Sequence, residues 1–380
     1  MSIIKRKLML KFIEHPKLIY KKILESIKYF EGNLFENHQN TMLYILPADL
    51  LQIIRRELIN TVGLNVAKNL LYDLNQLSAD TIIQDAEDMG FKGIENVRYF
   101  FSIMALFGWG DGFNFKFDPE TSTGNVILKN FPIVDQNAKF QLHYDFAGIM
   151  ARMFKIVFDK DLFVEEVLCK SKGDEYCEFK IYPMREEEKQ KQNLSKYKQT
   201  VAQVSKKDAK SFPPFETFDK FIDEITMDEV GVLKYKGESR LVIKDVQSIN
   251  SMVYAVSSIL GRKTMGAILY RCGMRTKLPF TTQVKTLDDL KDSLSKLSLF
   301  GLGIFEVINN DSQNIKIILK NSPFAIGLPT EDTPICWVMA GILHQIIQNY
   351  LDKKILSIKE VECIATGKDK CVFEINTIKS

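Results

Sequence analysis

The sequence lacks any apolar run long enough to cross a membrane. No stretch of its 380 residues approaches 18 uninterrupted apolar residues, and a spanning helix needs about 20. The basic start at 5–7 is soon followed by Lys11 and Glu14, which interrupt the apolar core that a secretory signal would need. We therefore expect no transmembrane segment and a cytoplasmic location.

An excess of one charge is also missing. The 51 basic and 48 acidic residues leave a net charge of +3, and no five like charges stand in a row. Nucleic-acid-binding surfaces carry clustered positive charge. Nucleic acid is therefore not an expected partner.

The chain is poor in the motifs of common enzymes. None of its four histidines has a recognisable catalytic partner in sequence, and no glycine-rich phosphate loop is present. Gly108-Trp109-Gly110 and Gly301-Leu302-Gly303 both lack the third glycine of a dinucleotide-binding fingerprint. We therefore predict that the protein is not an enzyme.

The sequence does contain an internal repeat. The pattern Glu-x-x-Cys, a glycine and Cys-x-Phe occurs within 165–179 and again within 359–373, with matching residues 194 positions apart. Ile-Leu-Lys-Asn recurs at 127–130 and 318–321, and further matches run in the same order at offsets between 191 and 198. Chance matches would not keep their order and spacing, so the series indicates a duplicated domain.

Composition agrees with this division. At about 150 residues a domain, the length allows two or three domains. Between the copies, residues 185–210 are polar and contain no glycine, which is typical of a solvated linker. The expected parts are an N-terminal helical extension, a first domain, a linker and a second domain, at 1–40, 41–183, 184–214 and 215–380.

The residue pattern of each copy predicts an α+β domain of helices and an antiparallel sheet. Helical spacing of apolar residues is followed by short β-branched strands, an amphipathic helix and a hairpin that turns at a glycine. The predicted elements are helices over 50–74 and 246–269, strands over 125–129 and 314–320, helices over 140–158 and from Thr333-Pro334 to Tyr350, and hairpins over 162–182 and 355–376. We expect the copies to pack through their helical faces as an intramolecular pseudo-dimer, with homodimerisation left open.

The cysteines of the hairpins are candidate metal ligands. Cys169 and Cys177 flank Gly173 symmetrically, as Cys363 and Cys371 flank Gly367. Two thiolates facing each other across a hairpin can form half of a tetrahedral zinc site. Buried free thiols and a cross-strand disulfide are the alternatives that the spacing leaves open.

The repeat also suggests the remaining ligands. His143 aligns with Cys336 at an offset of 193, an exchange that keeps metal-ligand chemistry. Glu166 and Glu360 each stand three residues before the first hairpin cysteine. On a flat strand, residues three apart point to opposite faces, so each glutamate can join the cysteines only if the strand is bulged or twisted.

These motifs resemble the vinyl reductase domain, a family of predicted hydrocarbon-binding proteins. The family pattern is a ligand before a glycine-containing helix, then Glu-x-x-Cys, a glycine turn and Cys-x-Phe. The resemblance implies the fold shared by the sensor domains of phenol- and toluene-responsive activators and by subunits of the TRAPP vesicle-tethering complex. It also implies two structural zinc ions per chain, held by His143, Glu166, Cys169 and Cys177 in the first copy and by Cys336, Glu360, Cys363 and Cys371 in the second.

The resemblance further implies an apolar ligand pocket. The first copy offers aromatic residues between 99 and 115, whereas the second is poorer in them. The candidate pocket residues are Tyr99, Phe100, Phe101, Phe107, Trp109, Phe113 and Phe115. The same rings could equally fill a core.

Three functions therefore remain under consideration. The first is a sensor that binds a small hydrophobic molecule and signals through an unidentified partner protein. The second is an interaction scaffold like the TRAPP subunits. The third, a reductase of vinyl groups or its accessory factor, is implied by the family name alone.

Overall fold

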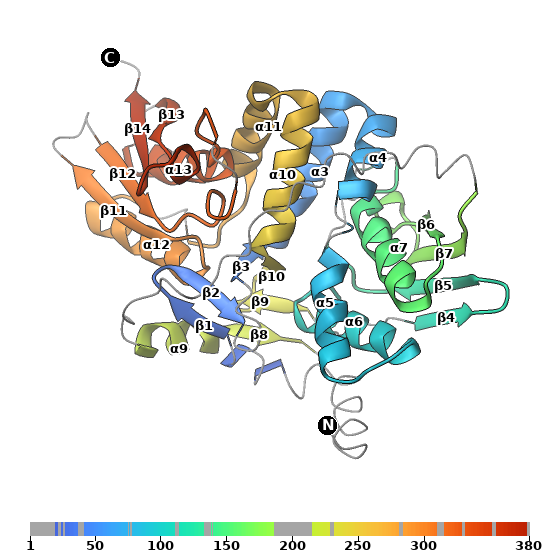
Figure 1. The fold of residues 1–380 in the computed structure, drawn as a ribbon. Coiled ribbons are helices and arrows are strands. Elements are labelled where there is room, and N and C mark those ends of the chain that lie inside the picture. The colour runs from blue at the N-terminus through green and yellow to red at the C-terminus, as the bar shows by residue number, and fades with distance from the viewer. Residues whose placement is uncertain are drawn as a thin grey trace.

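The computed structural model describes residues 20–21, 24–25, 27–36, 42–74, 76, 78–110, 114–132, 138, 140–185, 215–228, 232–280, 284–309, 315–328, 331–351 and 355–377. Two lobes, one from each copy, lie on either side of a central sheet, and helices from both copies pack over that sheet (Figure 1). Among these residues, no helix is both long enough and apolar enough to span a membrane.

The central sheet is shared by the two copies. Its strands are antiparallel and run in the order β1 (Ile27–Phe30), β2 (Asn33–Glu36), β3 (Met42–Pro47), β10 (Ser239–Asp245), β9 (Leu233–Tyr235) and β8 (Ile225–Met227). At its centre Ile45 lies opposite Ile243, its own counterpart 198 residues later. The order is therefore symmetric about the contact between β3 and β10.

The strands β1 and β2 correct the prediction of a helical extension over 1–40. Residues 27–30 and 33–36 form a hairpin, whereas residues 1–19 lie outside the described part of the chain. Strands of four residues are too short to show an alternating pattern in the sequence. They are stabilised instead by pairing in the central sheet, β1 with β2 and β2 with β3, which the sequence does not reveal.

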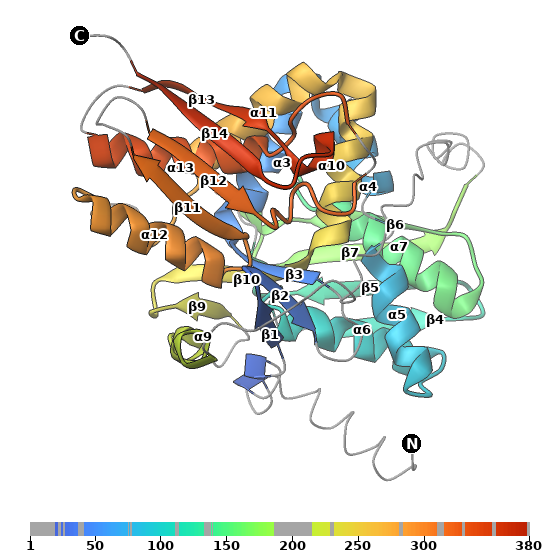
Figure 2. The same cartoon turned by 60° about the vertical axis from the view of Figure 1, so that its left-hand side comes forward.

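Each copy places its central strands against the lobe of the other copy. The amide of Ile45 donates to the carbonyl of Phe300 (2.9 Å), and the amide of Ile243 donates to the carbonyl of Phe107 (2.9 Å). The amide of Gly303 likewise donates to Gly32 (2.8 Å). Figure 2 shows β1–β3 against the second lobe. The copies therefore complete one another, a contact that the sequence did not predict.

The helices over the central sheet also join the copies. The predicted helices are each divided in two, giving α3 (Ala48–Val62), α4 (Leu64–Leu74), α10 (Val246–Leu260) and α11 (Arg262–Arg275). The divisions fall at Gly63 and Gly261, whose φ of +81° a right-handed helix cannot contain. Helix α3 packs on α11, and α4 packs on α10.

Each lobe contains a four-stranded antiparallel sheet with a long helix packed against it. The first sheet has the order β4 (Asn114–Asp118), β5 (Thr123–Leu128), β7 (Cys177–Pro183) and β6 (Leu162–Leu168), and the second β11 (Ile304–Asn309), β12 (Ile315–Lys320), β14 (Cys371–Thr377) and β13 (Ile355–Glu362). The helices are α5 (Ser78–Asp88), α6 (Ile94–Leu106) and α7 (Tyr144–Phe158) in the first copy, and α9 (Phe215–Asp223), α12 (Leu287–Leu299) and α13 (Trp337–Leu351) in the second. The predicted strands and hairpins are confirmed.

The long helices begin later than the sequence predicts. Helix α7 begins at Tyr144 rather than near 140, and α13 begins at Trp337 rather than at Thr333-Pro334. In each copy a glutamate carboxylate accepts a hydrogen bond from the amide of the residue just before the helix, His143 or Cys336. The preceding segment is therefore held outside the helix, next to the hairpin.

Candidate metal centres

The hairpins place both cysteine pairs in the core. In the first copy a short 3-10 turn, Lys170–Lys172, and Gly173 (φ +98°) connect β6 to β7, and in the second Ile364–Thr366 and Gly367 (φ +79°) do the same between β13 and β14. All four hairpin cysteines are at most 1% exposed. The left-handed turn favours glycine, which explains its place midway between each pair.

A β-bulge brings each glutamate to the cysteine side of its strand. The register shifts between Glu166 and Leu168, and between Glu360 and Glu362. The extra residue resets the alternation of side chains, so Glu166 and Glu360 point inward and are buried. The bulge that the spacing required is present in both copies.

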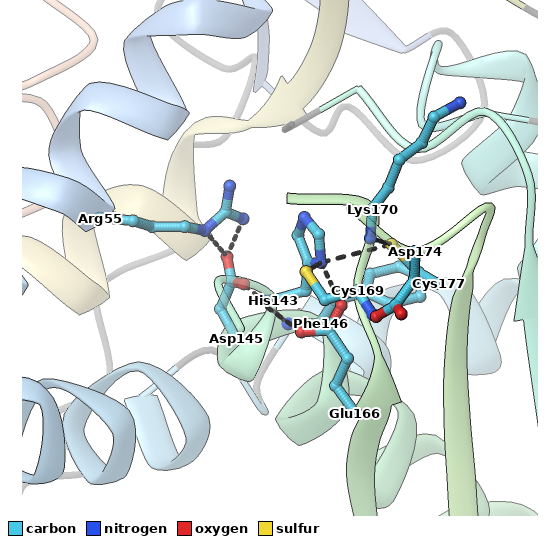
Figure 3. A network of polar contacts seen from close by, with 9 residues as sticks. All are labelled: Arg55, His143, Asp145, Phe146, Glu166, Cys169, Lys170, Asp174 and Cys177. Atoms are coloured by element: carbon cyan, nitrogen blue, oxygen red, sulfur yellow. Dashed lines mark hydrogen bonds and ion pairs between the residues drawn. The ribbon is translucent and has the colours of Figure 1, made fainter. Parts of the chain in front are cut away.

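The first cluster gathers one atom from each of four buried side chains (Figure 3). The Nδ1 atom of His143 lies 3.7 Å from the sulfur of Cys169 and 3.7 Å from that of Cys177. It lies 2.6 Å from Oε1 of Glu166. All four candidate ligand atoms are within 4.8 Å of one another.

The second cluster contains three sulfurs at the spacing of a tetrahedron. The sulfur of Cys336 lies 4.0 Å from that of Cys363 and 3.6 Å from that of Cys371, and the last two are 3.9 Å apart. A regular tetrahedron with Zn–S bonds of about 2.3 Å has edges of about 3.8 Å. A disulfide would need about 2.05 Å, and all three cysteines are free.

The carboxylates are oriented in the same way in both clusters. One oxygen of Glu166 accepts from the amide of His143 (3.2 Å), and one oxygen of Glu360 accepts from the amide of Cys336 (2.8 Å). The other oxygen of Glu360, Oε1, is buried and has no hydrogen-bond partner. A buried carboxylate oxygen is costly unless a donor or a cation satisfies it, so this orphaned atom fits a metal ion.

The electrostatics of the clusters also fit a cation. Hydrogen bonding from Cys177 lowers the pKa of Cys169 to about 2, and hydrogen bonding from Cys336 and Cys371 lowers the pKa of Cys363 to about 2. Burial raises the pKa of Glu360 to about 9. Without a cation each cluster stabilises one thiolate and resists further ionisation, whereas a bound divalent ion would favour the ionised form of every ligand.

Backbone and hydroxyl groups surround the sulfurs. The amide of Lys170 donates to the sulfur of Cys177 (3.4 Å), and the amide of Ile364 donates to that of Cys371 (3.4 Å). The hydroxyl of Ser322 lies 3.2 Å from the sulfur of Cys336. Such outer contacts hold metal ligands in place.

Two tyrosines that the sequence did not assign to the site support the hairpins. The amide of Val164 donates to the hydroxyl of Tyr72 (3.1 Å), and the amide of Ile358 donates to that of Tyr270 (2.9 Å). Both amides lie two residues before the cluster glutamate. The sequence does contain a signal for these two tyrosines, because Leu71-Tyr72 recurs as Leu269-Tyr270 in the internal repeat.

The aromatic residues proposed for a ligand pocket occupy several places. Tyr99 packs with Phe91 in a small separate cluster, and Phe100 contacts Phe101 edge to face. Trp109 stacks on Phe146 of α7, and its indole nitrogen donates to the carbonyl of Ile243 in the other copy (3.1 Å).

The remaining candidates complete this picture. Phe107 is half-buried against the core, and Phe115 packs on Phe154. Phe113 lies outside the described residues. A ligand pocket among these rings therefore stays a prediction.

Comparison with known proteins finds the same family model in both copies. The family model of the vinyl-4-reductase domain matches residues 127–183 and 315–377. The first match contains the whole first cluster and the second match contains the whole second cluster.

Individual relatives match parts of the chain. An uncharacterized protein of Methanocaldococcus jannaschii, MJ1460, is 35% identical over 101 residues, which cover 25% of this chain and 57% of that protein. The phenol-bound sensory domain of the transcription activator PoxR is 14% identical with a TM-score of 0.38, covering 48% of this chain and 96% of that one. A vinyl-4-reductase family protein from M. jannaschii is 23% identical with a TM-score of 0.25, covering 34% and 88%.

Proposed function

We propose that this chain, which carries two vinyl-4-reductase domains in tandem, is a non-enzymatic protein that binds a small hydrophobic molecule and is held together by two structural zinc ions. A partner protein would receive the signal. The pair of buried four-ligand clusters carries the zinc assignment, and the domain match in both copies supports the hydrophobic ligand.

The donor sets favour zinc. His143, Glu166, Cys169 and Cys177 would hold one ion, and Cys336, Glu360, Cys363 and Cys371 the other. Thiolate, imidazole and carboxylate ligands in fours are typical of tetrahedral zinc. When bound, zinc would supply a fixed link between the hairpin and the helix that begins beside it.

The closed ligand sets favour a structural role over a catalytic one. Catalytic zinc sites keep one position open for water or substrate, whereas each cluster here provides four protein ligands. All eight side chains are at most 8% exposed. A reductase would also need a site for a hydride donor, and the sequence offers no motif for one.

A scaffold is the second candidate function, and the shared central sheet favours it. The copies contribute strands to one shared sheet and form a built-in pseudo-dimer, which is a frame for a protein partner. A small cavity lies where the copies meet, and its apolar lining is of the kind that ligand sites have.

Native mass spectrometry of the purified chain tests the proposal. The expected spectrum shows two zinc ions and, in protein purified under gentle conditions, a retained small molecule that is lost on activation. Acid-denatured spectra give the metal-free mass as the control. Protein with two zinc ions and no affinity for any of a panel of small hydrophobic compounds would favour the scaffold, and protein without stoichiometric metal would overturn the zinc assignment.

A further inference from the structure

An apolar cavity lies at the contact between the two copies. Strand β3 and helix α3 of the first copy form one wall, and helices α10, α11 and α13 of the second form the others. The cavity volume, taken as the space open to the centre of a water molecule, is about 10 Å³. Because a buried water needs two to four polar partners, this lining favours an apolar occupant.

The one polar side chain in the lining is already satisfied as a donor. The Nδ2 atom of Asn250 donates to the carbonyls of Pro323 (2.7 Å) and Ile326 (3.4 Å). Both N–H bonds of the amide are therefore used. A molecule bound in the cavity therefore need not accept a hydrogen bond from Asn250.

The pseudo-symmetry of the fold relates this cavity to an equivalent position, formed by α3 and α7 of the first copy and β10 of the second. Three lining residues are Leu46, Val253 and Val338. The offset of 198 that relates β3 to β10 and α3 to α10 makes Lys244 the counterpart of Leu46 and Arg55 the counterpart of Val253. The offset of 193 that relates α7 to α13 makes Asp145 the counterpart of Val338.

These three counterparts form a buried charged cluster. Arg55, Asp145 and Lys244 are 2%, 8% and 7% exposed. Arg55 donates through Nε to Oδ2 of Asp145 (3.1 Å), and a second nitrogen donates to the same oxygen (Figure 3). The Lys244 ammonium lies 5.4 Å from the centre of the Trp109 ring, and burial lowers its pKa although Asp245 and Asp145 oppose the change.

The two equivalent positions thus have opposite chemistry. Beside α10 and α13 aliphatic side chains leave a void. At the equivalent position beside α3 and α7, Arg55 pairs with Asp145, and both act electrostatically on Lys244. Placing an apolar molecule among buried charges would remove their partners at a high cost in free energy. The charged cluster therefore excludes the kind of guest that the cavity accepts.

We propose that the chain binds one small apolar molecule or alkyl group in the cavity beside α10 and α13, and that Arg55, Asp145 and Lys244 close the equivalent position beside α3 and α7. This rests on the proposed function and gives it a location, a ligand class and a stoichiometry. It places the ligand where the two copies meet, whereas the aromatic residues of the sequence had suggested the first copy. Because Leu46 and helix α3 belong to the first copy, a molecule bound in the cavity would contact both copies. Its binding would therefore depend on how the two copies pack together.

Xenon tests this proposal, because it is apolar and monatomic and can be followed by ¹²⁹Xe NMR. The zinc-loaded full chain is expected to bind one xenon. The Val338→Leu substitution adds a methylene at the cavity wall and should weaken xenon binding at least about tenfold. Val66→Leu, the same change at a residue 47% exposed, should leave it unchanged.

A second variant tests the closed site. Replacing all three charges together, with Arg55→Val, Asp145→Val and Lys244→Leu, leaves no unpaired buried charge and should create a second xenon site in protein that retains two zinc ions. Val338→Leu alone decides the location if this triple variant does not fold.

The outcomes are separable. No bound xenon in the wild-type chain, or binding that is unchanged by Val338→Leu, would overturn the inference. In the latter case the ligand-binding function would stand, with its site elsewhere. A folded triple variant that binds only one xenon would overturn the closure of the first site.

Discussion

A single bulged residue in each hairpin allows the candidate metal ligands to meet. Val167 and Val361 take no part in the pairing register that their neighbours follow. Val361 is 39% exposed, as expected for a residue pushed out of the ladder. Without the extra residue, Glu166 and Glu360 would face away from the cysteines. The ligand set therefore depends on a local irregularity as much as on residue type.

Replacing one cysteine in either cluster should remove one metal ion. Cys177→Ser and Cys371→Ser are each expected to lose one of two zinc ions and to lower the melting temperature, because structural zinc contributes directly to folding. Elemental analysis and thermal unfolding check this. Cys272→Ser is the control, since Cys272 is buried in α11 but belongs to neither cluster, and it should retain both ions. Two ions in Cys177→Ser would contradict the assignment.

Asp73 in α4 should make stability depend on pH. Burial raises the pKa of Asp73 to about 7, so between its ordinary value and 7 the folded state holds a proton that the unfolded state has lost. Stability should therefore fall as pH rises from about 4 to 7 and then level off. The expected result for Asp73→Asn is a flatter profile and a more stable protein at pH 7.5.

Urea midpoints of both proteins between pH 4.5 and 8 provide the measurement. The difference between the two midpoints isolates Asp73 from the other titrating groups. Parallel profiles would show that Asp73 is not responsible.

Among the elements, the long helices depend on close backbone approaches. A Cβ at Gly148 of α7 would lie 1.9 Å from the carbonyl oxygen of Tyr72 in α4, and one at Gly341 of α13 would lie 2.1 Å from that of Tyr270 in α11. The repeat therefore retains a glycine in both copies for the same steric reason. The same tyrosines accept hydrogen bonds from the hairpins, so each contact links two helices and the strand that leads to the candidate metal cluster.

Adding a methyl group at this contact should separate the helices. Gly148→Ala is expected to reduce the free energy of unfolding by about 3 kcal/mol, since overpacking against backbone is not relieved by a side-chain rotation. Gly90→Ala is the control: it has open space around the added carbon and φ +85°, so only about 1 kcal/mol of left-handed strain applies. Chemical denaturation measures both, and equal losses would argue against the steric reason.

At the scale of the whole molecule, the two copies cannot be separated without exposing a strand edge. Strand β3 is completely buried, and it pairs along its length with β10 of the other copy. The lobes also exchange main-chain hydrogen bonds through Phe107 and Phe300. Each copy is therefore an incomplete folding unit.

A fragment of residues 1–183 should consequently pair with itself. The free edge of β3 is a template for another strand, and Ile45 would face its own copy where Ile243 lies now. We expect a homodimer or aggregates by light scattering after size-exclusion chromatography. A stable monomer would show that the shared sheet is not needed.

The sequence by itself determined the duplication, the α+β class and the eight candidate metal ligands. These features are local: Glu-x-x-Cys, the glycine turn and Cys-x-Phe lie within 14 residues in each copy, and the repeat supplied His143 and Cys336 by alignment. Helix interruptions at Gly63 and Gly261 were also readable in principle, because both glycines belong to the repeat.

Only the tertiary structure decided how the copies combine. The pairing of β3 with β10 joins segments 198 residues apart, and no periodicity within either strand specifies that partner. The same pairing brings Leu46 of one copy to α10 and Lys244 of the other to α3. Neither residue belongs to a recognisable motif. That one is apolar and the other charged becomes informative only because the symmetry of the fold places them in equivalent positions.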